Sequence, residues 1–330
     1  MKIVRTGAVV VQKIMHRVHQ WPSKIVHQIY CLDYIRKTRE RSRADLIQSH
    51  GRYRSNLEDD EFFLGYDLID KGFCSTKYDI FESFQNQDFF SSANMIYDFM
   101  EDHYVKTGKT IDIIKSLSAN PSLLEHFTTV FRAGLDAELL RVVEHYLRLP
   151  VAYGGVDFFF TIADGSERGA RTWHKDSEDN PMIKVAVYLN DVGDDDGPFE
   201  ILHLQQNDPQ SQKFRGFFQQ DLIDLQNEDK IKFDITSFTG PLGTVILCDT
   251  FKYFHRGKPA RGRNRRALFF NYYAEKPLTP YFCPNPPFST LKMKELVADL
   301  SPKQKDAALW REKLVGVDRI VTKRRPYLSI

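Results

Sequence analysis

Residues 157–163 read DFFFTIA, a run of aromatic and β-branched residues of the kind that favours β-strands. Residues 183–189 follow with the two-residue alternation of a strand, and residues 244–248 and 267–274 are further apolar and aromatic runs. Turns that contain glycine, such as residues 194–197, separate these runs. The second half of the chain is therefore predicted to be rich in strands.

The first half of the chain has the three- and four-residue spacing of apolar side chains that is typical of helices. Residues 92–104 and 120–147 are the clearest cases, and Asn120-Pro121 supplies an N-cap followed by proline at the first helical position. Residues 68–73 are predicted to form a short strand that enters a turn. Helices followed by a strand-rich half with long connections predict an α+β fold with a β-sandwich or barrel core.

A chain of 330 residues can bury a sizeable core, and 42% hydrophobic and 27% charged residues are ordinary values for a globular protein. The four cysteines lie far apart and form no CxxC pair, which argues against a structural zinc site and a disulfide framework. The apolar run at residues 8–11 is interrupted by Gln12 and Lys13 and is too short to span a membrane. These features predict a cytoplasmic protein, with peripheral membrane association left open.

The amino-terminal segment is strongly basic. Residues 1–54 contain twelve Lys or Arg against three Asp or Glu, a net charge of about +9 in a chain whose overall net charge is +2. Such a segment is compatible with contact to an anionic membrane, to nucleic acid or to an acidic partner. Residues 14–35 have the pattern of an amphipathic helix broken near Pro22, and residues 36–54 read as a linker or an exposed helix. A helical extension that is solvated and packed on the domain is the favoured interpretation.

A His-Lys-Asp triplet at residues 174–176 is followed 79 residues after its aspartate by His255. In an extended segment, residues i and i+2 share one face, so His174 and Asp176 can point at the same ion. Two imidazoles and one carboxylate can bind one face of an octahedral Fe(II) and leave the opposite face for a bidentate co-substrate and dioxygen. His174, Asp176 and His255 are therefore candidate metal ligands.

Each of these three residues also has a simpler interpretation. His174 could be a surface histidine, Asp176 a turn residue beside Ser177, and His255 a residue at the end of a strand. A lone HxD triplet is weak evidence, because such triplets arise by chance in long chains. The metal site is favoured because Trp173 precedes the triplet and strand patterns follow it.

A basic run after His255 ends in Arg265-Arg266. An arginine shortly after the second histidine is what a chelating 2-oxoacid would need to anchor its far carboxylate. Adjacent residues of a strand point to opposite faces, so only one of this pair can face the interior. Arg168, Lys175 and the basic residues of 256–263 could bind an anionic substrate, although a solvated basic rim is the favoured interpretation.

Several of these segments together resemble the phytanoyl-CoA dioxygenase-like branch of the Fe(II)/2-oxoglutarate-dependent oxygenases. They are residues 173–176, residues 187–191, Gly197-Pro198 and the block from His255 to residues 265–268. The resemblance covers about two-thirds of the chain. It implies a double-stranded β-helix (jelly-roll) core with flanking helices and an N-terminal helical extension.

The resemblance also implies the site and its cofactors. His174, Asp176 and His255 would be the catalytic iron ligands, and Arg265, rather than the alternative Arg266, would bind the co-substrate 2-oxoglutarate, with dioxygen as the second co-substrate. The sequence departs from the family at Gly257, where the family often has a small hydroxyl-bearing residue.

The implied activity is that of a dioxygenase that hydroxylates an unactivated C–H bond of a small-molecule, lipid-linked or sugar-acid substrate, with release of succinate and carbon dioxide. The carboxylate of Asp176 predicts hydroxylation, desaturation or ring formation, because related halogenases have a small residue at that position. The alternatives are a cupin-like metalloenzyme that does not use 2-oxoglutarate, and a non-catalytic scaffold that docks on anionic membranes through residues 1–54. No nucleic-acid partner is expected.

The predicted domain organisation has three parts. Residues 1–54 form the basic amphipathic extension, residues 55–280 the oxygenase domain and residues 281–330 a tail that packs on the domain. Within the domain, residues 203–239 are polar and rich in glutamine, with little strand character, and are predicted to be a lid-like insertion over the site.

Overall fold

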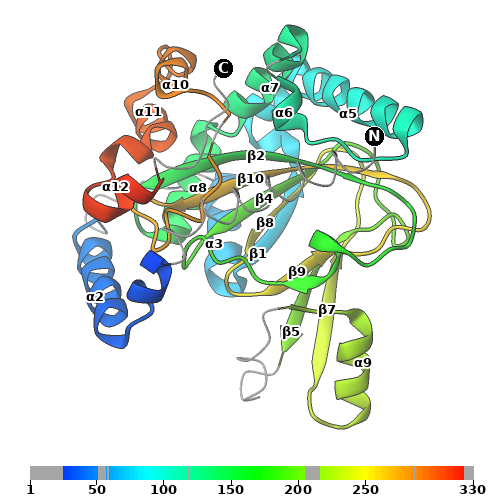
Figure 1. Cartoon of the computed structure of the whole chain (residues 1–330), viewed down its shortest axis with the longest axis horizontal. Coiled ribbons are helices and arrows are strands. Elements are labelled where there is room, and N and C mark those ends of the chain that lie inside the picture. Colours follow the sequence, from blue (N-terminus) through cyan, green and yellow to red (C-terminus); the bar gives the residue numbers. More distant parts are fainter. Residues whose placement is uncertain are drawn as a thin grey trace, which may run out of the picture.

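Two antiparallel five-stranded sheets form the centre of the computed structural model, which describes residues 25–50, 57, 59–117, 119–204, 216–285 and 287–322 (Figure 1). Sheet A has the strand order β1-β8-β4-β10-β2, and sheet B has the order β6-β3-β9-β5-β7. The strands of sheet A are β1 (Phe73–Lys77), β2 (Val151–Thr161), β4 (Ile183–Tyr188), β8 (Thr244–Asp249) and β10 (Arg265–Ala274). Those of sheet B are β3 (Trp173–His174), β5 (Phe199–Leu204), β6 (Gly216–Phe217), β7 (Phe233–Phe238) and β9 (Phe254–Gly257).

Helices cover the outer face of sheet A, the face turned away from sheet B (Figure 1). Those of the first half of the chain are α2 (Asp33–His50), α3 (Asp59–Lys71), α4 (Glu82–Gln85), α5 (Gln87–Thr107), α6 (Ile113–Leu117), α7 (Pro121–Ala133) and α8 (Ala137–Leu147). Those of the second half are α10 (Thr290–Leu296), α11 (Pro302–Ala308) and α12 (Gly316–Thr322), whereas α9 (Gln219–Asn227) lies against sheet B. The predicted α+β class is confirmed.

The two faces of sheet A are buried in different cores. In β4, Val185 and Val187 belong to the large core beneath the helices, whereas Ala186 belongs to a smaller core that it shares with Phe199 of sheet B. Because successive side chains of a strand point to opposite faces, Lys184 shares the inner face with Ala186. The inner face of sheet A, turned toward sheet B, therefore carries a lysine.

The same alternation separates the two arginines of β10. Leu268 and Phe270 lie in the core beneath the helices, and Phe269 lies in the core between the sheets. Two-residue periodicity then directs Arg265 inward, toward sheet B, and Arg266 outward, toward the helices.

The predicted strands agree with β2, β4, β8 and β10, whereas three predictions in other regions need correction. Residues 68–71 belong to helix α3, and the strand β1 begins only at Phe73. The helix predicted over residues 120–147 is two helices, because Asp136 caps a new helix by accepting a 3.0 Å hydrogen bond from the Leu139 amide. The cap at Asn120 and the helix over residues 92–104 are confirmed.

The third correction concerns residues 203–239, of which 205–215 lie outside the described residues. Strand β7 pairs with β5 along its whole length, so the segment has more strand character than its composition predicts. Helix α9 follows β6, and its residue Leu222 joins Trp173 and Phe254 in a core on the outer face of sheet B. Among the described residues of this segment, β6 and β7 are the edge strands of sheet B, and α9 covers the outer face of that sheet (Figure 1).

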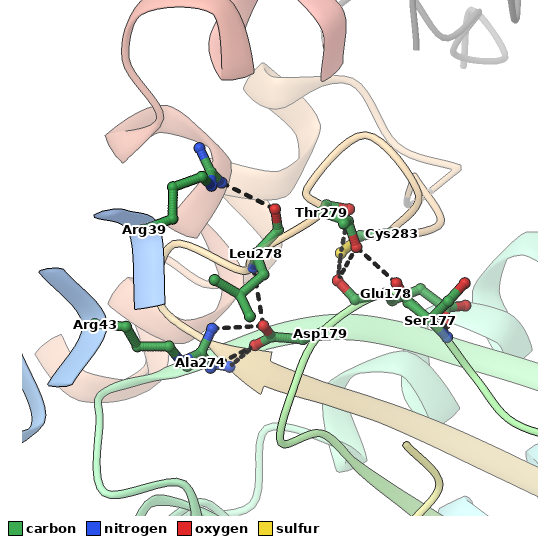
Figure 2. Close-up of polar contacts among 9 residues, drawn as sticks. All are labelled: Arg39, Arg43, Ser177, Glu178, Asp179, Ala274, Leu278, Thr279 and Cys283. Atoms are coloured by element: carbon green, nitrogen blue, oxygen red, sulfur yellow. Dashed lines mark hydrogen bonds and ion pairs between the residues drawn. The ribbon is translucent and has the colours of Figure 1, made fainter. Parts of the chain in front are cut away.

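The amino-terminal extension packs on the domain where it is described. Its first 24 residues, including the predicted break near Pro22, lie outside the described residues; residues 25–30 are helical and α2 begins at Asp33. Arg43 of α2 is buried and makes a bidentate ion pair with Asp179, at 2.6 and 2.9 Å (Figure 2). Asp179 also accepts hydrogen bonds from the backbone amides of Ala274 and Leu278. None of the helices in the described ranges is long and apolar enough to cross a bilayer.

Replacing Arg43 by methionine is expected to lower the free energy of unfolding by about 3 kcal/mol, because it leaves the buried carboxylate of Asp179 without its charged partner. Urea unfolding followed by circular dichroism measures the change. The matched control is Arg36→Met in the same helix, where an exposed arginine pairs only with Asp33 and Glu40 and no measurable change is expected. Equal stabilities of the two variants would contradict the prediction.

Candidate metal centre

The two histidines of the candidate site lie on neighbouring strands of sheet B. In the antiparallel pair of β3 and β9, His174 is directly opposite His255, and the centroids of the two rings are 4.3 Å apart. The residues beside them, Trp173 and Arg256, lie on the opposite face, where the guanidinium of Arg256 stacks on the indole ring at 4.3 Å. Strand alternation therefore sends both imidazoles toward sheet A.

Both imidazoles are held in one tautomer by the backbone. The Nδ1 atom of His174 lies 2.8 Å from the carbonyl oxygen of Thr172, and that of His255 lies 3.3 Å from the carbonyl oxygen of Tyr253. A carbonyl oxygen only accepts hydrogen bonds, so each Nδ1 carries the proton and donates it. Each Nε2 therefore keeps a free lone pair, as a metal ligand requires.

The carboxylate of Asp176 completes a group of three donors. The chain turns after β3, and the Asp176 amide donates to the carbonyl oxygen of Thr250 at 3.1 Å. Its Oδ2 lies 3.5 Å from Nε2 of His255, and the donor atoms of His174, Asp176 and His255 all lie within 4.8 Å of one another. The three residues predicted from the sequence are thus brought together, and their side chains could hold one metal ion.

Electrostatics prepare these groups for a cation. Burial lowers the pKa of His255 to about 3, against a smaller opposing effect of Asp176, so this imidazole is neutral and able to bind a metal at neutral pH. Burial would raise the pKa of Asp176, but the positive charge of Lys184 and the contact with His255 outweigh it and hold the pKa below its usual range. Asp176 is therefore a carboxylate and not a carboxylic acid.

Lys184 is a residue of the site that the sequence analysis missed. Its Nζ lies 2.8 Å from Oδ2 of Asp176, and its side chain is only 16% exposed. Burial lowers its pKa, but Asp176 and Glu178 outweigh this effect and raise the pKa above its ordinary value, so the lysine is charged. The signal in the sequence is the lysine itself, because the other residues of strand 183–188 are apolar or aromatic.

A cavity of about 640 Å³ is lined by His174, His255 and Arg265. The guanidinium of Arg265 is buried and donates to the carbonyl oxygen of Gly197 and to Oγ1 of Thr161, while its Nε has no hydrogen-bond partner. Within the described residues Arg265 makes no ion pair with a carboxylate. A buried cation with no counter-ion is costly, so this arginine is suited to an anionic ligand.

Gly257 makes room for this arginine. A Cβ atom at position 257 would lie 2.5 Å from Nη2 of Arg265, closer than non-bonded atoms approach. The departure from the family pattern at this position therefore has a packing reason in this chain.

Arg266 lies outside the cavity. It pairs with Asp98 at 2.8 Å and with Glu101 at 2.5 Å, both on α5. Its charge is thus neutralised on the helix side of sheet A, as the alternation along β10 requires.

No family model matches the chain, and no curated protein matches it in sequence. Solved structures to which it is similar include AviO1 from Streptomyces viridochromogenes, with 15% identity and a TM-score of 0.45 over 67% of this chain and 98% of that chain. EctD from S. alaskensis with bound Fe has 17% identity and a TM-score of 0.44 over 68% of this chain and 81% of that one. HygX from Streptomyces hygroscopicus, with nickel and 2-oxoglutarate bound, has 15% identity and a TM-score of 0.39 over 66% of this chain and 88% of that chain.

These TM-scores all lie below 0.5, and the similarities by themselves assign no activity to this chain. The functional proposal therefore depends on the geometry of the donors, the arginine and the cavity.

Proposed function

We propose that this protein is an Fe(II)- and 2-oxoglutarate-dependent oxygenase. The observation that carries the proposal is a His-Asp-His donor set whose two histidines line the same cavity as a buried arginine that has no carboxylate partner among the described residues. The donor set suits a divalent iron with open positions. The arginine suits the far carboxylate of a chelating 2-oxoacid.

Each residue has a defined part in this proposal. His174 and His255 bind the iron through Nε2, because their Nδ1 protons are donated to backbone carbonyls. Asp176 binds as a carboxylate whose other contact is the ammonium of Lys184. Arg265 binds and orients the distal carboxylate of 2-oxoglutarate together with Thr161.

Iron with bound 2-oxoglutarate supplies the activation of dioxygen for oxidation of a substrate C–H bond, with release of succinate and carbon dioxide. The chain surrounds this chemistry with apolar side chains. Phe199 lies 5.6 Å from the His255 ring, and Phe269 lies 6.0 Å from Phe199 and 5.1 Å from Phe159, measured between ring centroids. These rings exclude water from the reacting region, which protects the oxidation from side reactions.

The finer assignments form part of the same proposal. Successive strands alternate between the sheets from β2 to β5 and again from β7 to β10, which supports a double-stranded β-helix and kinship with the phytanoyl-CoA dioxygenase-like oxygenases. The Asp176 carboxylate supports hydroxylation of a small-molecule substrate. A cupin-like enzyme without 2-oxoglutarate is less favoured, because it would leave Arg265 with no anion to bind.

A non-catalytic membrane scaffold is also less favoured. Arg39 and Arg43 of the basic extension are engaged with Asp318 and Asp179, so part of its positive charge is directed at the domain itself (Figure 2 shows both arginines against it).

Anaerobic titration of Fe(II) and 2-oxoglutarate into the metal-free protein tests the proposal. The expected result is the weak visible charge-transfer absorption of an Fe(II)–2-oxoacid chelate, which appears only when both are present and is lost in His255→Ala. His203→Ala is the matched control, because this histidine of sheet B contacts Thr236 and is not one of the three donors. Absence of the absorption from folded, iron-loaded protein would shift the assignment to the cupin-like alternative.

A further inference from the structure

The charged residues that line the cavity all carry the same sign. They are Lys109, Arg168, Arg171, Lys184, Arg256 and Arg265. Within the described residues, no Asp or Glu lines the cavity. Several positive charges around one cavity concentrate field lines there, so the cavity favours anionic ligands.

The buried cations of this set already have partners or an assigned ligand. Lys184 is paired with Asp176. The guanidinium of Arg256 lies on the outer face of sheet B, over Trp173 and paired with Glu200 at 2.8 Å, so it adds no charge to the cavity. Arg265 is assigned to the distal carboxylate of 2-oxoglutarate. The deep part of the cavity is therefore close to electrically balanced once the co-substrate is bound.

The exposed end of the cavity, which we call the mouth, is not balanced. It is lined by Lys109 on the loop after α5 and by Arg168 and Arg171 before β3. Arg168 and Arg171 share the single carboxylate of Asp164, at 2.8 and 2.5 Å, whereas the Lys109 ammonium has no partner within the described residues. The mouth therefore has an excess of about two positive charges.

Between the mouth and the donors, the cavity wall is aromatic. Tyr104 and Phe160 lie together on the helix side of the edge strand β2, with ring centroids 6.4 Å apart, whereas Phe159 and Phe269 lie on the inner face of sheet A, which carries Lys184 and Arg265. An apolar passage that ends in a basic mouth matches a ligand with an apolar body and one anionic end.

We propose that the substrate has an apolar reacting part and a terminal carboxylate or phosphate, and that Lys109 and Arg168 hold this anion at the mouth. The apolar part then passes the edge strand β2 at Phe160 and lies against Phe159 on the inner face of sheet A, toward the candidate iron site, so the site of oxidation is at the end remote from the charge. The inference rests on the proposed oxygenase function for the reaction, although the anion site itself does not require a metal. It replaces the interpretation of these cations as a solvated rim.

Calorimetric titration of 4-phenylbutyrate and of 4-phenylbutan-1-ol tests the inference, since the two probes share the apolar part and differ in the anion. The titrations use the full chain loaded with Ni(II) and 2-oxoglutarate. The acid is expected to bind more tightly than the alcohol. Lys109→Met is expected to lower the affinity for the acid by about three- to fivefold, which is the range for one exposed ionic contact, and to leave the affinity for the alcohol unchanged. Phenyl phosphate in a parallel titration distinguishes a preference for phosphate from one for carboxylate.

Lys106→Met is the matched control. Lys106 is an exposed lysine one turn earlier in the chain, it pairs with Asp102, and it does not line the cavity, so the variant removes the same charge from outside the mouth. Equal affinities of acid and alcohol, equal effects of the two variants, or no binding of the acid at concentrations on the order of millimolar would overturn the inference. A protein that does not load with metal and 2-oxoglutarate would refute the oxygenase proposal instead, and the comparison of Lys109→Met with Lys106→Met could still be made on metal-free protein.

Discussion

Replacing Asp176 by alanine is expected to abolish turnover and to weaken metal binding by more than the roughly 10- to 100-fold that loss of an outer-shell partner costs. The variant removes the only carboxylate of the donor set and leaves the two imidazoles. Metal affinity is measured by competition with a chelator, and turnover by succinate release from 2-oxoglutarate. An Asp176→Ala protein that still produced succinate in step with substrate oxidation would remove Asp176 from the mechanism.

The same substitution is expected to reduce stability through Lys184. Loss of one partner from a buried ion pair costs about 3–5 kcal/mol, because the other charge is left uncompensated, and both side chains of this pair are largely buried. The double variant Asp176→Ala/Lys184→Met removes both charges, so it should regain most of the stability in urea unfolding but none of the metal binding. This pair of results separates a lost ligand from a lost fold. A double variant as unstable as the single one would show that Lys184 is neutralised by other groups.

Replacing Arg265 by methionine is expected to weaken 2-oxoglutarate binding on the order of 100-fold, within the 2–5 kcal/mol that truncation of a buried charged pair costs. Metal affinity should change little, because Arg265 is not a donor. Without the co-substrate, the variant should be at least as stable as the wild type, because the arginine has no carboxylate partner in the described residues and its Nε is unsatisfied. The stabilisation that 2-oxoglutarate adds to the metal-loaded protein in thermal unfolding should disappear.

Arg266→Met is the matched control for this prediction. The two arginines are adjacent in β10, but Arg266 pairs with Asp98 and Glu101 on the helix side of the sheet. Its replacement should leave the affinity for 2-oxoglutarate unchanged. If Arg266→Met weakened 2-oxoglutarate binding as much as Arg265→Met, the inward direction of Arg265 could not be the reason for the effect.

Local patterns in the sequence were sufficient for many of the elements. The strand periodicity of residues 183–189 and 267–274 predicted β4 and β10, and the Asn120-Pro121 pair predicted the start of α7. The failures have local causes as well. Residues 68–71 include the apolar pair Leu68-Ile69 but continue helix α3. Strand β7 was missed because its inner face carries the polar residues Asp234 and Thr236 and its pairing with β5 is a tertiary contact.

The residue types alone identify the candidate donors. The adjacency of Arg265 and Arg266 requires them to lie on opposite faces of a strand, because its side-chain period is two residues. The same period predicts a shared face for His174 and Asp176, but β3 ends at His174, and the turn that follows brings the Asp176 carboxylate to the imidazoles.

Contacts between distant segments determine which of these possibilities are realised. The register of β3 against β9 places His255 opposite His174, the core between the sheets gives Arg265 and not Arg266 the inward direction, and the inner face of β4 brings Lys184 to Asp176. Each of these depends on contacts between segments far apart in the chain and on the burial that such contacts create. Burial lowers the pKa of His255, and Arg265 is buried without a carboxylate partner among the residues that the structure describes; neither property can be deduced from residues that are neighbours in sequence alone.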